Sequence, residues 1–588
     1  MKLRRLEIYN FRGIKSLDWR LPSDARLLTL VGPGDSGKST ILEGIHYLLG
    51  DRWNIAFSDV DFFAADVEHE IKIRALLVDI PTPLRKENAF GLWLSGLDAG
   101  DELHQDPEDQ YIPALIVSLT VDSSLEPRWA VERVDGQLQS LSAAQRRSFS
   151  TFKVDDRTDT QLRWSRTSAL GRLSAEGGGE RDALAAASRA ARDVLADHQN
   201  SSLADLAARV QERTNRIGAG RFTAIKPGLD TSRSSMGAAL SLYEDVIPLT
   251  SFGLGSRRLA SLAVQQMAAG TRSVAVVDEV ESGLEPHRAV RLLEYLLTDS
   301  DYSQVIVTTH SPIIVEQARI ENIATVQNSQ GMVTVTSLGG ASERLQKLRR
   351  VRPSSFLARR VVIAEGATEY GLLIACVDFW DASRSATGLS TAAGEGAAIQ
   401  DGQGGSEVPL RAQVMAQLGY ETAGFMDNDV RDSDYAVAQA QAAGVAIIRW
   451  EEGHQTESQV CAQLDVNGLN SLLDLAVELR NSEETVIQDL NSIDPFKPIP
   501  SLDVSAWLTP TLTIAEARVR VAKAAGERKW FKNVEGGKAL GTWMIRHIDE
   551  PQLEQVAARL YAVRRFLYPD AQIASQPTAV AAEEMFHG

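Results

Sequence analysis

The sequence predicts an α/β fold class, with two successive α/β units and a run of helices after the second. The first observation is an apolar run at 27–31, which is followed by a glycine-rich turn and a segment with helical periodicity. The second is a pair of apolar strands at 273–280 and 304–310. The third is a new strand–turn–helix series after a basic junction at 346–360. At about 150 residues per domain, 588 residues predict three or four domains, or two with insertions.

Composition excludes several classes of protein. The chain is 44% hydrophobic and 24% charged, which is close to globular averages and excludes disordered and fibrous classes. A net charge of -17 argues against a protein that coats nucleic acid by bulk charge, but leaves a local basic patch or metal-bridged contact open. Cys376 and Cys461 are too isolated for a disulfide framework or a structural zinc site. Because no apolar run approaches ~18 residues, we expect a cytoplasmic protein with no membrane partner.

A complete G-x-x-x-x-G-K-[ST] motif follows the first apolar strand. Its place between a strand and a helix is the context in which such a loop wraps phosphate oxygens with backbone N–H groups. Lys38 would reach the β- and γ-phosphates of ATP, and Ser39 would be a ligand of Mg²⁺. The alternative is an ordinary glycine-rich turn. The residues expected to bind the nucleotide here are Gly32, Gly34, Asp35, Ser36, Gly37, Lys38, Ser39 and Thr40.

Two carboxylates end the apolar strand that begins at Val274. Asp278 would hold Mg²⁺ through water, and Glu279 would polarise the attacking water. The alternative is a solvated acidic turn. The sequences SGLEP at 282–286 and TTH at 308–310 follow in order, and this succession resembles the Walker B, D-loop and switch-histidine series of ABC-type ATPases. That resemblance implies that His310 senses the γ-phosphate.

The same resemblance implies a signature loop that completes the nucleotide site of a second copy. The candidate is SFGLGS at 251–256, which departs from the usual LSGGQ; a flexible loop before a helix is the alternative. Gly255 and Ser256, with Gly253, would supply donors to the γ-phosphate.

About 240 residues separate the two phosphate-site motifs, so we expect an insertion, with alanine-rich helices at 180–217 as the candidate dimerisation element. The start NFRGIK, with Arg12 after a strand, resembles the RecF and SMC branch of these ATPases, which acts on DNA. The expected domains are the N-terminal ATPase part at 1–165, the helical dimerisation insertion at 166–240, the C-terminal ATPase part at 241–345, a second α/β domain at 346–568 and a flexible tail at 569–588.

Acidic residues follow the strands of the second unit. Strand 360–364 ends in Glu365, and Glu369 follows four residues later; the strand before Asp427 ends in D-x-D with Asp429. Alternate residues of an extended backbone share a face, and strand ends at one sheet edge would make an oxygen-ligand site for Mg²⁺ or Mn²⁺. The alternative is a set of solvated acids at strand ends.

This E-G-x-x-E and D-x-D pattern resembles a TOPRIM domain, so the second α/β domain at 346–568 is expected to be a TOPRIM nuclease domain. Together with the ATPase motifs, IAEGATEY and DNDV resemble the OLD (overcoming lysogenization defect) family of ATP-dependent nucleases, including the nuclease subunit of Gabija anti-phage systems. The resemblance implies a two-metal DNA nuclease that uses ATP and Mg²⁺, with Mn²⁺ or Ca²⁺ as alternatives at the nuclease site. It assigns catalysis to Glu365 and Asp427, and metal binding to Glu365, Glu369, Asp427, Asp429 and Glu457. A late lysine is also implied; Lys538 is preferred to Lys532, and a surface lysine is the alternative.

The leading prediction is an ATP-regulated, metal-dependent endonuclease of double-stranded DNA in anti-phage defence. A RecF-like repair ATPase with a non-cleaving TOPRIM domain is the alternative, and a topoisomerase- or primase-like enzyme is a third. We expect a homodimer or higher homo-oligomer, and a UvrD-like helicase or a retron as a further partner.

The segment 384–406 is expected to be a loop. A basic cluster is expected to grip DNA, with a solvated junction as the alternative; it consists of Arg344, Lys347, Arg349, Arg350, Arg352, Arg359 and Arg360.

Overall fold

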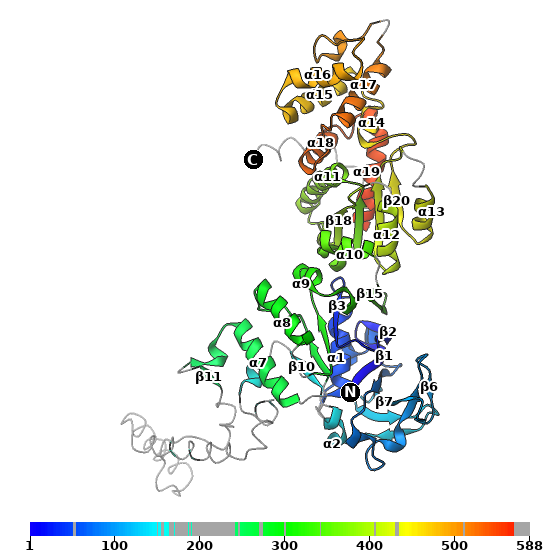
Figure 1. The fold of residues 1–588 in the computed structure, drawn as a ribbon, viewed down its shortest axis with the longest axis vertical. Helices are drawn as coiled ribbons and strands as arrows, with labels where there is room; N and C mark the ends of the chain where they lie inside the picture. Colours follow the sequence, from blue (N-terminus) through cyan, green and yellow to red (C-terminus); the bar gives the residue numbers. More distant parts are fainter. Residues whose placement is uncertain are drawn as a thin grey trace, which may run out of the picture. The chain divides into compact units, whose positions relative to one another are not determined.

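Mixed helices and strands fill both halves of the chain in the computed structural model (Figure 1), which confirms the predicted α/β class. The structure describes residues 1–50, 55–149, 151–154, 158–163, 242–244, 247–269, 274–298, 302–340, 343–404, 407–429, 434–509 and 512–569, with a few single positions between 168 and 190. Two compact units are distinguished: the first comprises Met1–Thr29 and Ser39–Thr309, the second Leu30–Lys38 and His310–Gly588. Within the described ranges, no helix is both long and apolar enough to cross a membrane.

The first unit begins with an antiparallel sheet. Strand β1 (Lys2–Phe11) pairs with β2 (Ile14–Arg20) on one side and with β4 (Ile71–Val78) on the other. The sheet continues through β7 (Ile112–Val121) to β8 (Pro127–Glu132). Buried and exposed residues alternate along β2, as expected for a strand with one solvated face. Shorter elements of this region are β5 (Ser95–Leu97), β6 (Leu103–His104), β9 (Leu138–Ser140), α2 (Ala143–Arg146) and α3 (Thr158–Gln161).

A parallel set of strands carries the nucleotide motifs, of which the glycine-rich loop belongs to the second unit and the carboxylate motif to the first. Its strands are β10 (Phe152–Val154), β13 (Val274–Val277) and β14 (Gln304–Thr308), and β3 (Leu27–Val31) follows β14 in the sheet. Every residue of β3, β13 and β14 is buried, which is typical of parallel strands covered on both faces. The helices here are α1 (Lys38–Leu49), α7 (Leu254–Ala269) and α8 (Pro286–Thr298), and β11 (Tyr243–Glu244) pairs antiparallel with β12 (Ile247–Pro248).

A four-stranded parallel sheet organises the second unit, in the order β18–β17–β19–β20. Its strands are β17 (Arg360–Ala364), β18 (Ala397–Asp401), β19 (Glu421–Met426) and β20 (Ala446–Arg449). The order reverses between β17 and β19, so their carboxyl ends form the crevice where open α/β sheets bind ligands. The connecting helices are α11 (Ala367–Ala386), α12 (Val408–Gln417) and α13 (Asp434–Ala442).

Before this sheet, the second unit contains α9 (Pro312–Gln317), α10 (Glu343–Val351) and a hairpin of β15 (Ile323–Ser329) and β16 (Met332–Ser337). After it come α14 (Thr456–Cys461), α15 (Val466–Arg480), α16 (Glu483–Ile493), α17 (Ile514–Glu527), α18 (Val534–Arg546) and α19 (Glu554–Leu567). The run of helices predicted after the second α/β unit is therefore confirmed. One hydrophobic core joins these helices to β17, β19 and α11, which lie together in Figure 1.

Helices α11 and α18 approach so closely that glycines are required between them. A Cβ atom on Gly371 would lie 2.1 Å from the carbonyl oxygen of Val534, and one on Gly537 would lie 2.3 Å from that of Thr368. Real Cβ atoms do not approach backbone oxygens this closely. The glycines therefore fix the position of α18, and of the residues just before it, against α11.

Two sequence predictions need correction or lie outside the described residues. The segment 384–406 is not a continuous loop, because strand β18 lies within it and pairs with β17. Its sequence, AAIQD, has little of the β-branched and aromatic content by which a strand is recognised. The predicted dimerisation insertion at 166–240 falls almost wholly outside the described residues, as does the tail after 569.

Candidate functional site

The phosphate-binding loop has a backbone that demands glycine. Gly32 has φ +152°, and a Cβ atom there would lie 2.3 Å from the carbonyl oxygen of Val326. Gly37 has φ 97°, and Asp35 adopts φ 58° with an exposed side chain. Gly34 is exposed with open space around it, and Thr40 lies in the first turn of α1. These features describe a loop with room above its backbone, as phosphate binding requires.

Lys38 lies folded over this loop. Its Nζ donates to the carbonyl oxygens of Gly32 at 3.0 Å and Pro33 at 2.6 Å, and contacts Oγ of Ser36 at 3.2 Å. The side chain is 3% exposed, so the ammonium group is held at the loop by backbone oxygens. An anion bound to the loop would meet this charge directly.

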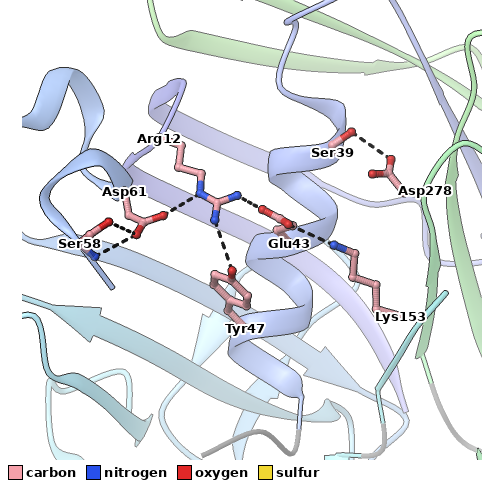
Figure 2. A network of polar contacts seen from close by, with 8 residues as sticks. All are labelled: Arg12, Ser39, Glu43, Tyr47, Ser58, Asp61, Lys153 and Asp278. Atoms are coloured by element: carbon pink, nitrogen blue, oxygen red, sulfur yellow. Dashed lines mark hydrogen bonds and ion pairs between the residues drawn. The ribbon is translucent and has the colours of Figure 1, made fainter. Parts of the chain in front are cut away.

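Ser39 and Asp278 meet in the first unit, as Figure 2 shows. The Oγ of Ser39 donates to Oδ1 of Asp278 at 3.0 Å, and Oγ1 of Thr308 donates to the same oxygen at 2.6 Å. The two sequence motifs that are 239 residues apart therefore place a hydroxyl and a carboxylate together. Such an oxygen pair suits Mg²⁺, and the hydroxyl of Thr308 fixes the carboxylate.

Glu279 has a backbone conformation that is rare for a residue with a side chain. Its φ is 44°, and its N–H donates to Oγ1 of Thr308 at 2.8 Å. Left-handed backbone at a non-glycine residue is concentrated at functional sites. His310 is exposed and follows β14 by two residues.

Arg12 anchors the helix that follows the phosphate-binding loop (Figure 2). Its guanidinium pairs with Glu43 of α1, donates to Asp61 at 2.9 Å and reaches the hydroxyl of Tyr47 at 3.3 Å. Nζ of Lys153 lies 3.1 Å from the other oxygen of Glu43. Two cations from distant segments thus hold one face of α1, and the structure gives Arg12 a positioning role in this chain.

The predicted signature segment is the start of helix α7, not a free loop. Gly255 and Ser256 lie in the first turn, and Gly253 precedes it. A Cβ atom on Gly255 would lie 2.4 Å from the carbonyl oxygen of Gly283, so this glycine is needed for packing against the SGLEP segment. The buried Arg258 of the same helix donates to the carbonyl oxygens of Asp278 and Ser282.

In the second unit, acidic residues meet where the strand order reverses. Glu365 follows β17, and Asp427 follows β19. The N–H of Asp427 donates to Oε2 of Glu365 at 2.6 Å, which links the two strand ends directly. Glu369, in the first turn of α11, accepts from the N–H of Gly366 at 3.1 Å and is 4% exposed. We call Glu365, Glu369, Asp427, Asp429 and Glu457 the acidic cluster.

Thr456 connects two members of the acidic cluster, and the sequence reasoning missed it. Its Oγ1 lies 2.8 Å from Oε1 of Glu369 and 3.1 Å from Oδ1 of Asp427, and its N–H donates to the same Asp427 oxygen at 2.9 Å. The indole Nε1 of Trp450 donates to Thr456 Oγ1 at 2.8 Å. Its position just before Glu457 in HQTESQ was the available signal.

Lys532 is the lysine beside the acidic cluster. Its Nζ lies 3.3 Å from Oε1 of Glu457, a side chain that is 2% exposed. Lys538, the residue preferred from the sequence, lies inside α18 and pairs with Glu535 at 3.7 Å instead. The sequence favours Lys538 because it is predicted to lie just before a helix, but that prediction is wrong because α18 starts at Val534. Lys532 lies in the turn just before α18. That turn is held in place because Oγ1 of Thr368 donates to the carbonyl oxygen of Phe531 at 3.0 Å.

Burial and mutual repulsion raise the pKa of three acidic-cluster carboxyls. Burial, followed by the charges of Glu369, Glu365 and Glu457, raises the pKa of Asp427 to about 8. Burial also raises the pKa of Glu365 and of Glu369. Burial alone would lower the pKa of Lys532, but the charges of Glu457, Glu369 and Asp427 outweigh it and raise that pKa. A cation at this position would relieve the repulsion.

The acidic cluster fits a divalent cation by its donors and its charge. Both oxygens of Glu457 are buried; Oε1 faces Lys532, and Oε2 has no hydrogen-bond partner among the described residues. Asp429 accepts from Nε2 of Gln455 at 2.5 Å. Carboxylate oxygens are the ligands that Mg²⁺ and Mn²⁺ prefer. However, no three His, Cys, Asp or Glu side chains in the described ranges converge closely enough to hold a metal ion as they stand. Metal binding would draw these side chains together.

The basic cluster is not a continuous free surface. Arg349 is 6% exposed, and its Nη1 donates to the carbonyl oxygens of Val315 at 2.5 Å and Ala318 at 2.9 Å. Arg344, Lys347 and Arg360 pair with Glu407, Glu343 and Glu421. Arg352 donates to the hydroxyl of Tyr370, and Arg359 to the carbonyl oxygen of Gly34 at 3.2 Å. Most of these cations therefore stabilise the fold locally.

Comparisons with solved structures find SMC head domains and RecF at low similarity. The SMC head domain from Thermotoga maritima is 16% identical, with 57% of this chain and 99% of that chain covered and a TM-score of 0.27. RecF with ATP is 13% identical, with 57% and 97% covered and a TM-score of 0.31. An SMC head bound to the C-terminal winged-helix domain of ScpA is 14% identical, with 59% and 100% covered and a TM-score of 0.34.

Sequence comparisons find a matching family model and a related nuclease. Residues 27–316 match a family described as "AAA domain, putative AbiEii toxin, Type IV TA system". The chain is 25% identical over 414 residues to the OLD nuclease of Thermus scotoductus, a match that covers 64% of this chain and 74% of that protein. Similarity to the nuclease subunit of Gabija systems stays a prediction. Residues 27–316 are thus similar to an AAA domain and the chain is similar to an OLD nuclease, which confirms the resemblance that its motifs predict.

Proposed function

We propose that this protein is an ATP-dependent endonuclease of double-stranded DNA that requires a divalent metal. The sheet β18–β17–β19–β20, with the acidic cluster, would have the role of a TOPRIM nuclease centre. The observation that carries the proposal is the meeting of Glu365, Glu369 and Asp427 where the strand order reverses, beside Lys532. Similarity to an OLD nuclease supports the same reaction class.

The acidic cluster, Thr456 and Lys532 would have different roles in the reaction. Glu365, Glu369, Asp427, Asp429 and Glu457 would hold Mg²⁺ or Mn²⁺, with Ca²⁺ as an alternative ion. Divalent ions bound there would lower the pKa of the attacking water and offset charge on the phosphate. Thr456 holds Glu369 and Asp427 in position through its hydroxyl. Lys532 would offset charge on a non-bridging phosphate oxygen, and it replaces Lys538 in this proposal.

The ATPase motifs would regulate access of DNA to the nuclease. The phosphate-binding loop with Lys38 would hold ATP, Ser39 and Asp278 would hold Mg²⁺, and Glu279 would polarise the attacking water. His310 would sense the γ-phosphate. Gly255 and Ser256 would complete the site of a second copy, which requires a homodimer or higher oligomer. A role in anti-phage defence, and a UvrD-like helicase or retron partner, remain predictions.

Incubation with supercoiled plasmid tests the proposal. Wild-type protein with Mg²⁺ or Mn²⁺, with and without ATP, should nick or linearise the plasmid, and Asp427→Ala should abolish cleavage. The matched control is Asp474→Ala, which removes an exposed carboxylate on α15 of the same unit. A plasmid that stays intact with the wild-type protein in every condition contradicts the nuclease and favours a RecF-like ATPase that binds DNA without cutting it. If Asp427→Ala cleaves the plasmid as fast as the wild-type protein does, the acidic cluster is not the site of the reaction.

A further inference from the structure

A cavity of about 840 Å³ lies beside the acidic cluster in the second unit. Helices α14 and α17 form its two sides, and Asp429 and Glu457 of the acidic cluster are part of its wall. Its volume is within the ~300–1,000 Å³ range of ligand pockets. If a phosphate of a ligand bound at the acidic cluster, the atoms next to that phosphate would therefore lie in this cavity.

One face of helix α17 keeps the cavity open. The residues that line it from this helix include Ala515, Val519, Ala522 and Gly526, spaced four, three and four apart, so they share one face. A second face of the helix, with Ala517, is buried in the core. These four residues have small side chains or none, and Val519 is 54% exposed. The helix thus has a packed face and a second face that leaves space.

The cavity wall also points to a ligand by its polar groups. Glu457 lines the cavity with a side chain that is 2% exposed. Its Oε1 lies 3.3 Å from Nζ of Lys532, and its buried Oε2 has no partner among the described residues. The amides of Gln455, Gln463 and Gln555 line the same space. Amides donate and accept hydrogen bonds at base edges, and small apolar side chains can contact base faces.

Cations complete the lining. Lys523 is exposed at the cavity, and Arg518 is held at its wall because its guanidinium donates to the carbonyl oxygens of Leu464 at 2.7 Å and Gln463 at 3.3 Å. Glu527 lines the cavity from the same helix as these two cations. A ligand with one phosphate at metal bound to the acidic cluster could place an adjoining phosphate at Arg518 and Lys523.

We propose that this cavity binds the sugar and base of the nucleotide next to the phosphate that is cut. The inference rests on the proposed nuclease function and specifies its substrate. A duplex is too wide for a cavity of this size, so the nucleotide must leave the base stack to enter. Substrates that are single-stranded or unpaired at the cut site should therefore bind more tightly than duplex of the same sequence.

Filling the cavity tests the proposal. Binding of a short fluorescein-labelled oligothymidine is measured by fluorescence anisotropy with Ca²⁺, for wild type and Val519→Trp. The affinity of the variant should fall by about tenfold or more, as expected when contacts to one base are lost. The control Gln488→Trp, at an exposed position of α16 outside the cavity, should bind like wild type. Ala515→Trp, at another exposed position of the cavity face, should repeat the loss if Val519→Trp does not fold.

The outcomes separate this inference from the nuclease proposal. If both cavity-filling variants bind oligothymidine as wild type does, or if wild type does not bind it or prefers duplex, the cavity is not a nucleotide site. If the cavity-filling variants lose binding while wild type leaves every DNA intact, the nucleotide site stands and the nuclease proposal fails. Stabilisation by Mn²⁺, measured from Tm, should be the same in Val519→Trp and Gln488→Trp, which shows that the filled cavity has not disturbed the acidic cluster.

Discussion

At the scale of single residues, the hydroxyl of Thr456 is the group that joins the acidic cluster. It accepts from Trp450 and lies within hydrogen-bond distance of two carboxylates, although it has one proton to donate. Thr456 can therefore donate to only one of the two carboxylates. The second contact is a hydrogen bond only if that carboxyl is protonated and donates to Oγ1 of Thr456. The raised pKa of Asp427 agrees with such a proton in the protein without metal.

Thr456→Val keeps the shape of the side chain and removes the hydroxyl. We expect a loss of about 1–3 kcal/mol in the free energy of unfolding, because Trp450 Nε1 and two buried carboxylates lose a partner. Cleavage should fall about 10–100-fold, as for loss of a group that orients metal ligands. Calorimetric titration with Mn²⁺ distinguishes positioning from simple stability. Weaker Mn²⁺ binding that Thr456→Ser restores supports the positioning role, and wild-type Mn²⁺ affinity in Thr456→Val contradicts it.

Lys532→Met should reduce cleavage at least about 100-fold, the usual effect of removing one group that stabilises transition-state charge. The matched variant Lys538→Met removes a lysine that pairs with the exposed Glu535 and should cleave at close to the wild-type rate. Single-turnover rates on plasmid measure both. If the rate falls more in Lys538→Met than in Lys532→Met, the catalytic lysine is Lys538, the residue preferred from the sequence.

The sequence was sufficient to predict the carboxylates but not their supporting residues. Glu365 and Asp427 each follow an apolar strand, and parallel strands bring such ends together, so their meeting follows from the pattern. The choice between Lys532 and Lys538 depends on the residue at which α18 begins and on how α18 packs. Neither is encoded in the local pattern, because helix boundaries are the least predictable feature of a sequence.

At the scale of elements, the close contact between α11 and α18 positions Lys532. Gly537→Ala should place a methyl group against the carbonyl oxygen of Thr368, where a Cβ atom would be 2.3 Å away. We expect a net destabilisation of about 1–3 kcal/mol from overpacking, even though alanine favours a helix by up to about 1 kcal/mol. Thermal unfolding measures the effect.

The matched control for that change is Gly526→Ala in α17. The nearest atom to its new Cβ would be 3.8 Å away, so Tm should stay the same or rise. Equal Tm in both variants would show that α11 and α18 can separate without cost. The helices of this region were predictable as helices, but their contact was not, since the glycines of α11 and α18 do not by themselves identify the backbone that approaches them.

Strand β18 shows a second limit at the scale of elements. Its alanine-rich sequence favours a loop by propensity, yet its backbone pairs along the whole of β17, from Arg360 with Ala397 to Ala364 with Asp401. Tertiary pairing therefore overrides local preference. The strand matters for the site, because its place on the far side of β17 creates the reversal of strand order at which Glu365 lies.

At the scale of the whole molecule, the net charge of -17 is consistent with contact to DNA through metal ions. The acidic cluster concentrates negative charge, and the basic cluster is mostly paired within the protein. Bulk attraction to DNA is thus weak, while bound divalent ions would convert a negative pocket into a phosphate-binding one. Binding of DNA should therefore depend strongly on divalent metal.

The rate of plasmid nicking at a fixed Mn²⁺ concentration, compared between wild type and Asp427→Asn, tests the central claim most directly. Asparagine keeps the shape of the side chain and removes its charge. The acidic cluster predicts that the rate falls at least about 100-fold in Asp427→Asn, and that chelation of the metal abolishes nicking by wild type. Nicking by Asp427→Asn at the wild-type rate, or nicking that persists after the metal is removed, would contradict the assignment of the acidic cluster as the nuclease centre.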